Sequence, residues 1–170
     1  ALAWHEGQTL MVWVAASLER CQSRILIAPQ GKYSLSGWET HPDFRPQLGP
    51  LAGLETALSL SNTEWIAFCG VDLPFLQVTD WERLCAAYRA ACPAPNSERS
   101  GILAVQAADE QGRAQPLVAL YHRKLLSRVT ALLDAGERRL KLASLPEHTL
   151  LVGGFDPQHL RNINTPEELG

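Results

Sequence analysis

The feature that most constrains the fold is an alternation of short apolar runs with segments of helical periodicity. Two of these runs, Arg24–Ala28 (RILIA) and Trp65–Cys69 (WIAFC), are too short for helices and too continuous for strands exposed on one face. Such runs are typical of strands in a parallel sheet that helices cover on both faces. Their alternation with helical segments predicts an α/β domain built largely from crossover units.

Helix boundaries are indicated by apolar spacing and by capping residues. Apolar residues recur at helical spacing between 9 and 21. Pro50 suits the first position of a second helix, and Thr79 with Glu82 has the spacing of a capping box for a third. The predicted helices cover about 9–21, 50–60, 79–92 and 122–134, the last stopped by Gly136, and a further one begins at Thr165.

Three further strands are expected in the second half of the chain, at 102–106, 115–121 and 149–153. Asp109–Arg113 (DEQGR) reads as the turn of a hairpin between the first two. No internal repeat or linker interrupts the sequence, so residues 1–170 are expected to form a single domain. The predicted architecture is a three-layer, Rossmann-like α/β fold with a mixed, mostly parallel central sheet flanked by helices.

Composition excludes several classes of protein. The net charge of -3 and the pI near 6.0 argue against a nucleic-acid-binding domain, where a basic face is expected. No apolar run approaches the ~18 residues of a membrane span, and the first residues do not read as a signal peptide. The four cysteines are irregularly spaced, which favours reduced thiols in the cytoplasm over a zinc site.

The most informative stretch is EWIAFCGVDLPFL, in which a buried strand runs directly into Asp72. In a parallel α/β sheet the carboxyl ends of the strands line the ligand crevice. A carboxylate at that point is suited to hold a hard divalent cation against phosphate groups. The alternative is that Asp72 closes the strand-to-helix turn with its side chain.

A second candidate is the segment Gln47–Leu54 (QLGPLAGL). Its small residues allow a sugar or a base to approach the backbone, and a helix N-terminus behind them favours anions. The segment has neither a Walker A lysine nor a G-x-G-x-x-G pattern. Gly49 and Pro50 could equally be no more than the start of a helix, and Gly53 a packing contact.

A third candidate is the closing segment, in which Asn162 and Asn164 alternate with Ile163. In an extended segment both amides point to one side while the isoleucine packs inward. Two parallel amides can bind a polar heterocycle or a phosphate. Alternatively, Asn164 is a turn residue before a helix cap at Thr165.

Taken together, these stretches resemble the molybdenum cofactor guanylyltransferases, within the broader sugar-nucleotide-transferase-like fold. The motifs that carry the resemblance are LGPLAGLETAL, VDLPFL after a WIAF strand, QPLVALY, LLDAGERRL and NINTPEEL, in the family's order. The resemblance implies an enzyme that binds GTP with Mg²⁺ and joins GMP to molybdenum-bound molybdopterin, releasing pyrophosphate. It also implies molybdoenzymes or other proteins of cofactor biosynthesis as partners.

The same resemblance assigns roles on the nucleotide side of the site. Asp72 falls on the family's catalytic, metal-binding aspartate. Gly49, Pro50 and Leu51 fall on its nucleotide-contacting loop. Asp43, upstream of that loop, matches an acidic residue near the nucleotide.

On the acceptor side, Asn162 and Asn164 fall on amides associated with molybdopterin.

The sequence departs from the family pattern in two places. The first is the family's N-terminal loop, a Gly-Gly-x-Ser-x-Arg-Met-Gly stretch followed by a lysine, which would precede Ala1. That loop wraps the triphosphate and offsets its charge. A second departure is the extra Gly70-Val71 before Asp72.

These observations leave two alternatives open. One is a cytidylyltransferase for molybdopterin, or for another small phosphate, on the same fold. The other is a non-catalytic domain that binds nucleotide or a partner protein without the triphosphate loop. The residues encoded before Ala1 distinguish an enzyme from a binding module.

Overall fold

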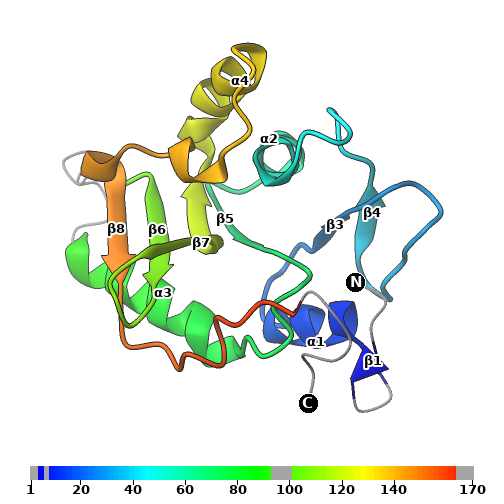
Figure 1. Cartoon of the computed structure of the whole chain (residues 1–170), viewed down its shortest axis with the longest axis horizontal. Helices are drawn as coiled ribbons and strands as arrows, with labels where there is room; N and C mark the ends of the chain where they lie inside the picture. The colour runs from blue at the N-terminus through cyan, green and yellow to red at the C-terminus, as the bar shows by residue number, and fades with distance from the viewer. Residues whose placement is uncertain (1–3, 6–7, 93–100, 164–170) are drawn as a thin grey trace.

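The computed structural model describes residues 4–5, 8–92 and 101–163 (Figure 1). The strands are β1 (Trp4–His5), β2 (Gln8–Thr9), β3 (Ile25–Ile27), β4 (Glu39–His41), β5 (Trp65–Cys69), β6 (Ala104–Ala108), β7 (Ala114–His122) and β8 (Thr149–Val152). The α-helices are α1 (Leu10–Ser17), α2 (Pro50–Leu60), α3 (Val78–Ala91) and α4 (Leu126–Asp134).

A four-stranded sheet in the order β5-β7-β6-β8 forms the centre of the molecule. Strand β7 is antiparallel to both β5 and β6, and β8 is parallel to β6. Three of the four strands therefore run in one direction, and the sheet is mixed as predicted, but two of its three strand pairs are antiparallel. Strands β3 and β4 form a separate parallel pair, and β1 and β2 form an antiparallel pair.

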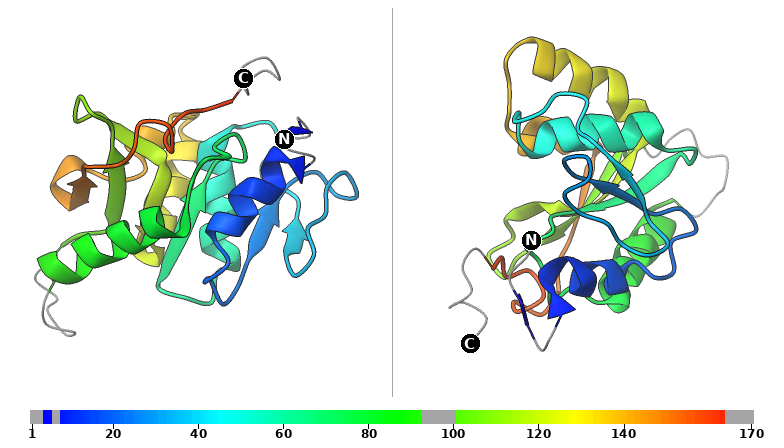
Figure 2. Two further views of the ribbon diagram at one scale, coloured as in Figure 1. Left: turned by 90° about the horizontal axis from the view of Figure 1, so that it is seen from below. Right: turned by 90° about the vertical axis from the view of Figure 1, so that its right-hand side faces the viewer.

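Helices cover both faces of the central sheet, as Figure 2 shows. Side chains alternate between the two faces along β6. Ala104 packs with Leu54 of α2 and Val129 of α4, whereas Val105 packs with Leu84 of α3. The prediction of a three-layer α/β domain is confirmed.

Helix α2 is fixed by a row of leucines in the layer that it shares with α4. Leu51, Leu54 and Leu58 are each 0% exposed. Burial of each side chain stabilises the fold by about 1.5–3 kcal/mol relative to exposure. The N-terminus of α2 is therefore held firmly at one end of the sheet, where the candidate site lies.

Several predicted boundaries need correction. Helix α3 begins at Val78, and the capping box predicted for Thr79 and Glu82 is wrong. Asp80, in the first turn of the helix, takes part in the capping box instead. It is 4% exposed, and its carboxylate accepts a hydrogen bond from the backbone N–H of Gln77 at 2.8 Å. Helix α1 ends at Ser17, and the helix predicted from Thr165 lies outside the described residues.

The hairpin turn at Asp109–Arg113 is confirmed, but the strand before it, β6, starts two residues later than expected. The Asp109 side chain accepts hydrogen bonds from the backbone N–H groups of Gln111 and Arg113, at 3.0 and 2.9 Å. The predicted helix at 122–134 opens with a 3-10 turn before α4. It ends, as expected, at Gly136 with φ of 85°.

Candidate active site

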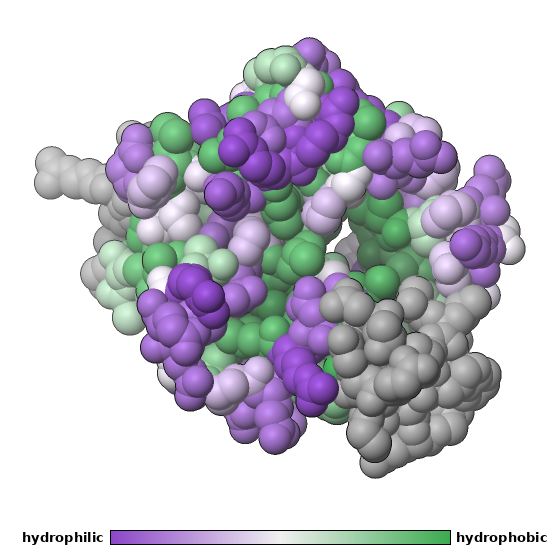
Figure 3. All heavy atoms as spheres, viewed as in Figure 1, coloured by the Kyte–Doolittle hydropathy of each residue, from purple (hydrophilic) through white to green (hydrophobic). Residues whose placement is uncertain are grey.

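A cavity of about 720 Å³ lies between β3 and β5, and Figure 3 shows the hollow bordered by hydrophobic residues. Asp43, Gly49, Pro50 and Asp72 all border it, although they come from separate parts of the chain. A volume of this size is in the range of small-molecule and cofactor sites. The structure thus brings together four of the residues predicted from the sequence.

Asp72 is held by a short loop that follows β5. The next residues, Leu73 and Leu76, are 2% and 4% exposed and anchor the loop in the core beneath α3. The carbonyl group of Asp72 accepts a hydrogen bond from the backbone N–H of Ile163 at 2.8 Å. Because the backbone on both sides is fixed, the carboxylate stays at the carboxyl end of β5.

Gly70, one of the two extra residues before Asp72, lies against the Asp72 side chain. A Cβ atom built on Gly70 would overlap Oδ1 of Asp72 and would lie 3.5 Å from Cδ1 of Leu117. The absent side chain is thus the space that the Asp72 carboxylate occupies. Glycine at this position sets the direction of that carboxylate.

Asp43 is held at the cavity by α2. Its Oδ1 accepts a hydrogen bond from Oγ1 of Thr56 at 3.1 Å, and the same hydroxyl accepts one from the backbone N–H of Phe44. Burial raises the pKa of Asp43, the Thr56 hydrogen bond opposes that rise, and the nearby Glu55 adds to it. The raised pKa means that the ionised carboxylate is disfavoured at this position, so a cation close to it would stabilise it.

An ion-pair network holds the loop that carries Asp43. Arg45 Nε lies 2.8 Å from Oε2 of Glu55, and an Arg45 terminal nitrogen lies 2.6 Å from Oδ1 of Asp134. The other carboxylate oxygen of Glu55 accepts a hydrogen bond from Thr130 at 2.8 Å. The Glu55 side chain is only 8% exposed, so both its oxygens need these partners.

The loop then turns sharply into α2. Gln47 and Gly49 both have positive φ, 64° and 77°, and only the second is a glycine. Pro50 takes the first helical position, and the N-cap residue, Gly49, has no side chain that could cap α2. Pro50 has no N–H, and the N–H groups of Ala52 and Gly53 donate to the Gly49 carbonyl at 3.1 and 3.4 Å. The backbone N–H of Leu51 and the partial positive charge of the helix N-terminus are therefore what this end of α2 offers a phosphate.

Leu51 and Asn162 were predicted to contact a ligand, but neither borders the cavity. The Leu51 side chain is 0% exposed in the core, so only its backbone could contact a ligand. Ile163 packs inward at 3% exposed, as predicted, and Asn162 is exposed beside it without bordering the cavity. Asn164 lies outside the described residues.

The acidic side chains suit a divalent cation that arrives with phosphate. Across residues 4–5, 8–92 and 101–163, no three acidic, histidine or cysteine side chains gather into a complete metal site. Magnesium is usually bound by one or two carboxylates, with waters and substrate phosphates completing its shell. Asp72, with Asp43 on the same cavity, matches that partial donor set.

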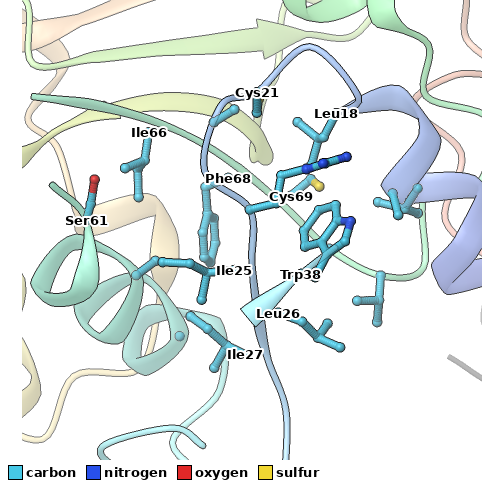
Figure 4. A pocket seen from close by; sticks show the side chains of 18 of the residues that line it. Leu18, Cys21, Ile25, Leu26, Ile27, Trp38, Ser61, Ile66, Phe68 and Cys69 are labelled. Atoms are coloured by element: carbon cyan, nitrogen blue, oxygen red, sulfur yellow. The ribbon is translucent and has the colours of Figure 1, made fainter. Parts of the chain in front are cut away.

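Two cysteines also border the cavity, Cys21 and Cys69 (Figure 4). Burial raises the pKa of both thiols, that of Cys69 to about 12. The thiolate is the nucleophilic form of cysteine, so raised values keep both thiols unreactive. They contribute apolar lining to the cavity.

Solved structures with the same architecture define the class of protein. The chain superposes on molybdopterin-guanine dinucleotide biosynthesis protein A from Archaeoglobus fulgidus with a TM-score of 0.71 and 20% identity, over 99% of this chain and 85% of that one. For 2-C-methyl-D-erythritol 4-phosphate cytidylyltransferase from Thermus thermophilus the values are 0.69 and 16%, over 99% and 89%. The fold is that of the nucleotidyltransferases.

Sequence comparison then gives the family. The model of the MobA-like NTP transferase domain matches residues 1–148. A Deinococcus radiodurans protein named "Probable molybdenum cofactor guanylyltransferase" is 50% identical over 99% of this chain and 82% of its own length. The molybdenum cofactor guanylyltransferase of Vibrio vulnificus is 34% identical over 96% and 80%. This chain belongs to the MobA-like NTP transferase family.

Sequence reasoning missed the residues that hold the site in place. Arg45, Glu55 and Thr56 fix the Asp43 loop, yet their partners lie up to 89 positions away in the chain. A charged residue within the apolar pattern of α2 was the available signal for Glu55, since such a residue needs a partner when buried.

None of the described helices is long and apolar enough to span a bilayer.

Proposed function

We propose that this protein transfers GMP from GTP to molybdenum-bound molybdopterin and releases pyrophosphate. The observation that carries the proposal is that Asp43, Asp72 and the uncapped N-terminus of α2 border one cavity. Membership of the MobA-like family and 50% identity to a relative named for this activity support it. Base choice, acceptor and metal are part of the proposal.

The reaction exchanges one phosphoric anhydride bond for another. A terminal phosphate oxygen of molybdopterin attacks the α-phosphorus of GTP, and the bond from that phosphorus to the bridging oxygen breaks. Pyrophosphate leaves with the bonding electron pair. Catalysis of such a step depends mainly on positioning and on stabilising the negative charge of the phosphates.

Residues of this chain would provide both the positioning of the phosphates and the stabilisation of their negative charge. The backbone N–H of Leu51 and the positive end of the α2 dipole would bind a phosphate oxygen, and Gly49 leaves no side chain in the way. Asp72 would hold Mg²⁺ against the phosphates, with Asp43 as a second acidic group. When bound, the cation would neutralise phosphate charge and stabilise the leaving pyrophosphate.

The molybdopterin acceptor is assigned to the side of the cavity nearest the closing segment. Ile163 is bonded to the Asp72 backbone, so the neighbouring Asn162 lies at the same end of the sheet. Its exposed amide is free to contact a pterin or phosphate, and Asn164 is proposed to act with it. Molybdoenzymes or other proteins of cofactor biosynthesis would take up the product, in a cytoplasm that keeps the four free thiols reduced.

Calorimetric titration with GTP, ATP, CTP and UTP tests the proposal. The protein should be titrated in the presence of Mg²⁺, with any residues encoded before Ala1 included. Tightest binding of GTP is expected, because a site that hydrogen-bonds one base edge leaves its own polar groups unpaired with another base. Equal binding of all four nucleotides would contradict the guanylyltransferase proposal.

A cytidylyltransferase is the second candidate. The Thermus thermophilus enzyme shares the fold over 99% of this chain, and the phosphate chemistry would be the same. Tighter binding of CTP than of GTP in the same titration would support this alternative.

A further inference from the structure

The segment 153–163, which follows β8, connects the two sides of the proposed site. It contains no helix or strand, and it runs from β8 past α3 toward α1 (orange to red in Figure 1). Near its start, Phe155 is 8% exposed and packs into the apolar cluster beneath α3. At its end, the backbone N–H of Ile163 donates to the carbonyl of Asp72 at 2.8 Å. The segment therefore carries Asn162 to a place beside the proposed metal-binding loop.

Between these two anchors, the His159 side chain makes a polar contact with α3. Its Nδ1 lies 3.1 Å from Oδ1 and 3.0 Å from Oδ2 of Asp80. The His159 side chain is 19% exposed and that of Asp80 is 6% exposed, so little water competes for this contact. The Asp80 carboxylate already accepts a hydrogen bond from a backbone N–H, so we take it as the acceptor here too, with the imidazole donating from Nδ1.

The same carboxylate holds the end of the loop that carries Asp72. Oδ2 of Asp80 accepts a hydrogen bond from the backbone N–H of Gln77 at 2.8 Å, and Gln77 is the N-cap residue of α3. Leu76, directly before it, is 4% exposed and anchors the loop in the core. Asp80 is thus bonded both to the Asp72 loop and to the segment 153–163.

Together these contacts form a closed circuit. From Asp72 the chain leads to Gln77, whose N–H is bonded to Asp80. Asp80 is bonded to His159, and the backbone after His159 returns to the Asp72 carbonyl. Moving one part of the circuit alone would break a hydrogen bond of a buried carboxylate, which is costly. Asn162 lies within the circuit, three positions after His159, so its backbone is fixed relative to Asp72.

We propose that His159, held by Asp80, is a positioning residue that places the acceptor relative to Asp72. It fixes the backbone that leads into Asn162 and so holds that amide in place for molybdopterin. A displacement of about 1 Å in a positioning contact can slow a reaction about 100-fold. This inference rests on the proposed function, and it assigns His159 no contact with the reacting atoms.

A purely stabilising role for His159 predicts a different outcome. Asp80 is a buried carboxylate, and in that case His159 would serve only to satisfy it. Loss of the contact would then lower Tm and leave the kinetics of the folded protein unchanged. The kinetic constants of the two substrates distinguish the roles, because the circuit includes the acceptor side and leaves the N-terminus of α2 untouched.

His159→Leu tests the proposal, because leucine has no donor for Asp80. The protein used should include any residues encoded before Ala1. The KM for molybdopterin should rise about tenfold, while the KM for GTP stays within about twofold. His159→Asn should restore the wild-type KM, because the asparagine Nδ2 can donate from the place of Nδ1.

Amide hydrogen exchange of Ile163, measured by NMR, is a second readout that needs no turnover. In His159→Leu this amide should exchange about tenfold faster than in the wild type, because one tie of the circuit is lost, and in His159→Asn it should exchange normally. His148→Leu is the matched control. Nδ1 of His148 lies 2.7 Å from the carbonyl oxygen of Gly101, at the opposite end of β8 from the segment 153–163. This control should lower Tm without changing either KM or the exchange of Ile163.

An unchanged KM for molybdopterin in His159→Leu, with a lower Tm, would overturn the proposal and leave the contact a stabilising one. A rise in both KM values, or a rise that His159→Asn does not reverse, would overturn it as well. Unchanged exchange of Ile163 would overturn it whatever the activity. Failure of the proposed function would show differently, as the absence of transfer by the wild-type protein.

Discussion

The ion-pair network around Glu55 gives a prediction with a calculable size. Arg45→Met leaves the Glu55 carboxylate, 8% exposed, with the Thr130 hydroxyl as its one remaining partner among the described residues. Removing one partner of a buried ion pair costs about 3–5 kcal/mol. The Arg45 side chain is 29% exposed, so water reaches the pair and the lower limit, about 3 kcal/mol, is expected.

Denaturant unfolding monitored by circular dichroism measures this loss. For a domain of this size, about 3 kcal/mol corresponds to a fall of about 6–12 °C in Tm. Asp134→Asn is the control, because the Asp134 side chain is 61% exposed and its pair with Arg45 should contribute at most about 1 kcal/mol. If Arg45→Met costs no more than Asp134→Asn, Glu55 does not depend on Arg45.

The double variant Arg45→Met/Glu55→Met separates stability from function. Replacing both members of a buried pair with apolar residues is often nearly neutral, so most of the lost stability should return. The Asp43 loop would still lack its tie to α2 and α4, so nucleotide affinity should stay reduced. Recovery of both properties together would refute the idea that the network positions this loop.

Two further predictions concern single residues at the cavity. Gly70→Ala should displace the Asp72 carboxylate, because the new Cβ would overlap its Oδ1. Nucleotide transfer should therefore fall more than tenfold, while Tm changes by a few degrees. Unchanged transfer would contradict this role of Gly70. Asp43→Asn should change the pH dependence of stability. Burial raises the folded-state pKa above its usual 3.8, so wild-type stability falls as pH rises through that range, because the unfolded state loses its proton first. The Asn variant should therefore gain stability relative to wild type between pH 3 and pH 7, measured by urea unfolding, and a constant difference would argue against the raised pKa.

Local sequence patterns predicted the elements that carry the site. The apolar run Trp65–Cys69 coincides with β5, and Asp72 lies at its end as expected. Pro50 begins α2, and Gly49 precedes it with positive φ. These features depend on residues close in the chain, which is why the sequence alone could indicate them.

Contacts between distant residues could not be predicted in this way. The Arg45–Asp134 pair joins a loop to a helix 89 positions later, and no local pattern encodes that meeting. The start of α3 was misplaced because Asp80 is buried beside His159, at 3.0 Å, and not exposed in the first turn. The sequence showed Gly70 only as part of a departure from a motif, and the contact that its missing Cβ leaves open for Asp72 is visible only in the structure.

The central claim, that Asp72 holds the cation on the nucleotide phosphates, is tested most directly by Asp72→Asn. Asparagine keeps the size and the hydrogen bonding of the turn but removes the charge that a hard cation requires. Asp156→Asn is the matched control, because Asp156 is an exposed turn residue whose carboxylate accepts from the backbone N–H of Gln158.

The measurement is transfer of GMP from labelled GTP to molybdopterin, at several Mg²⁺ concentrations, with Tm recorded for each protein. The protein used should include any residues encoded before Ala1. We expect Asp72→Asn to keep its Tm within a few degrees while transfer falls at least 100-fold, and Asp156→Asn to transfer normally. Near-normal transfer by Asp72→Asn would show that Asp72 only closes a turn, and would contradict the account at its centre.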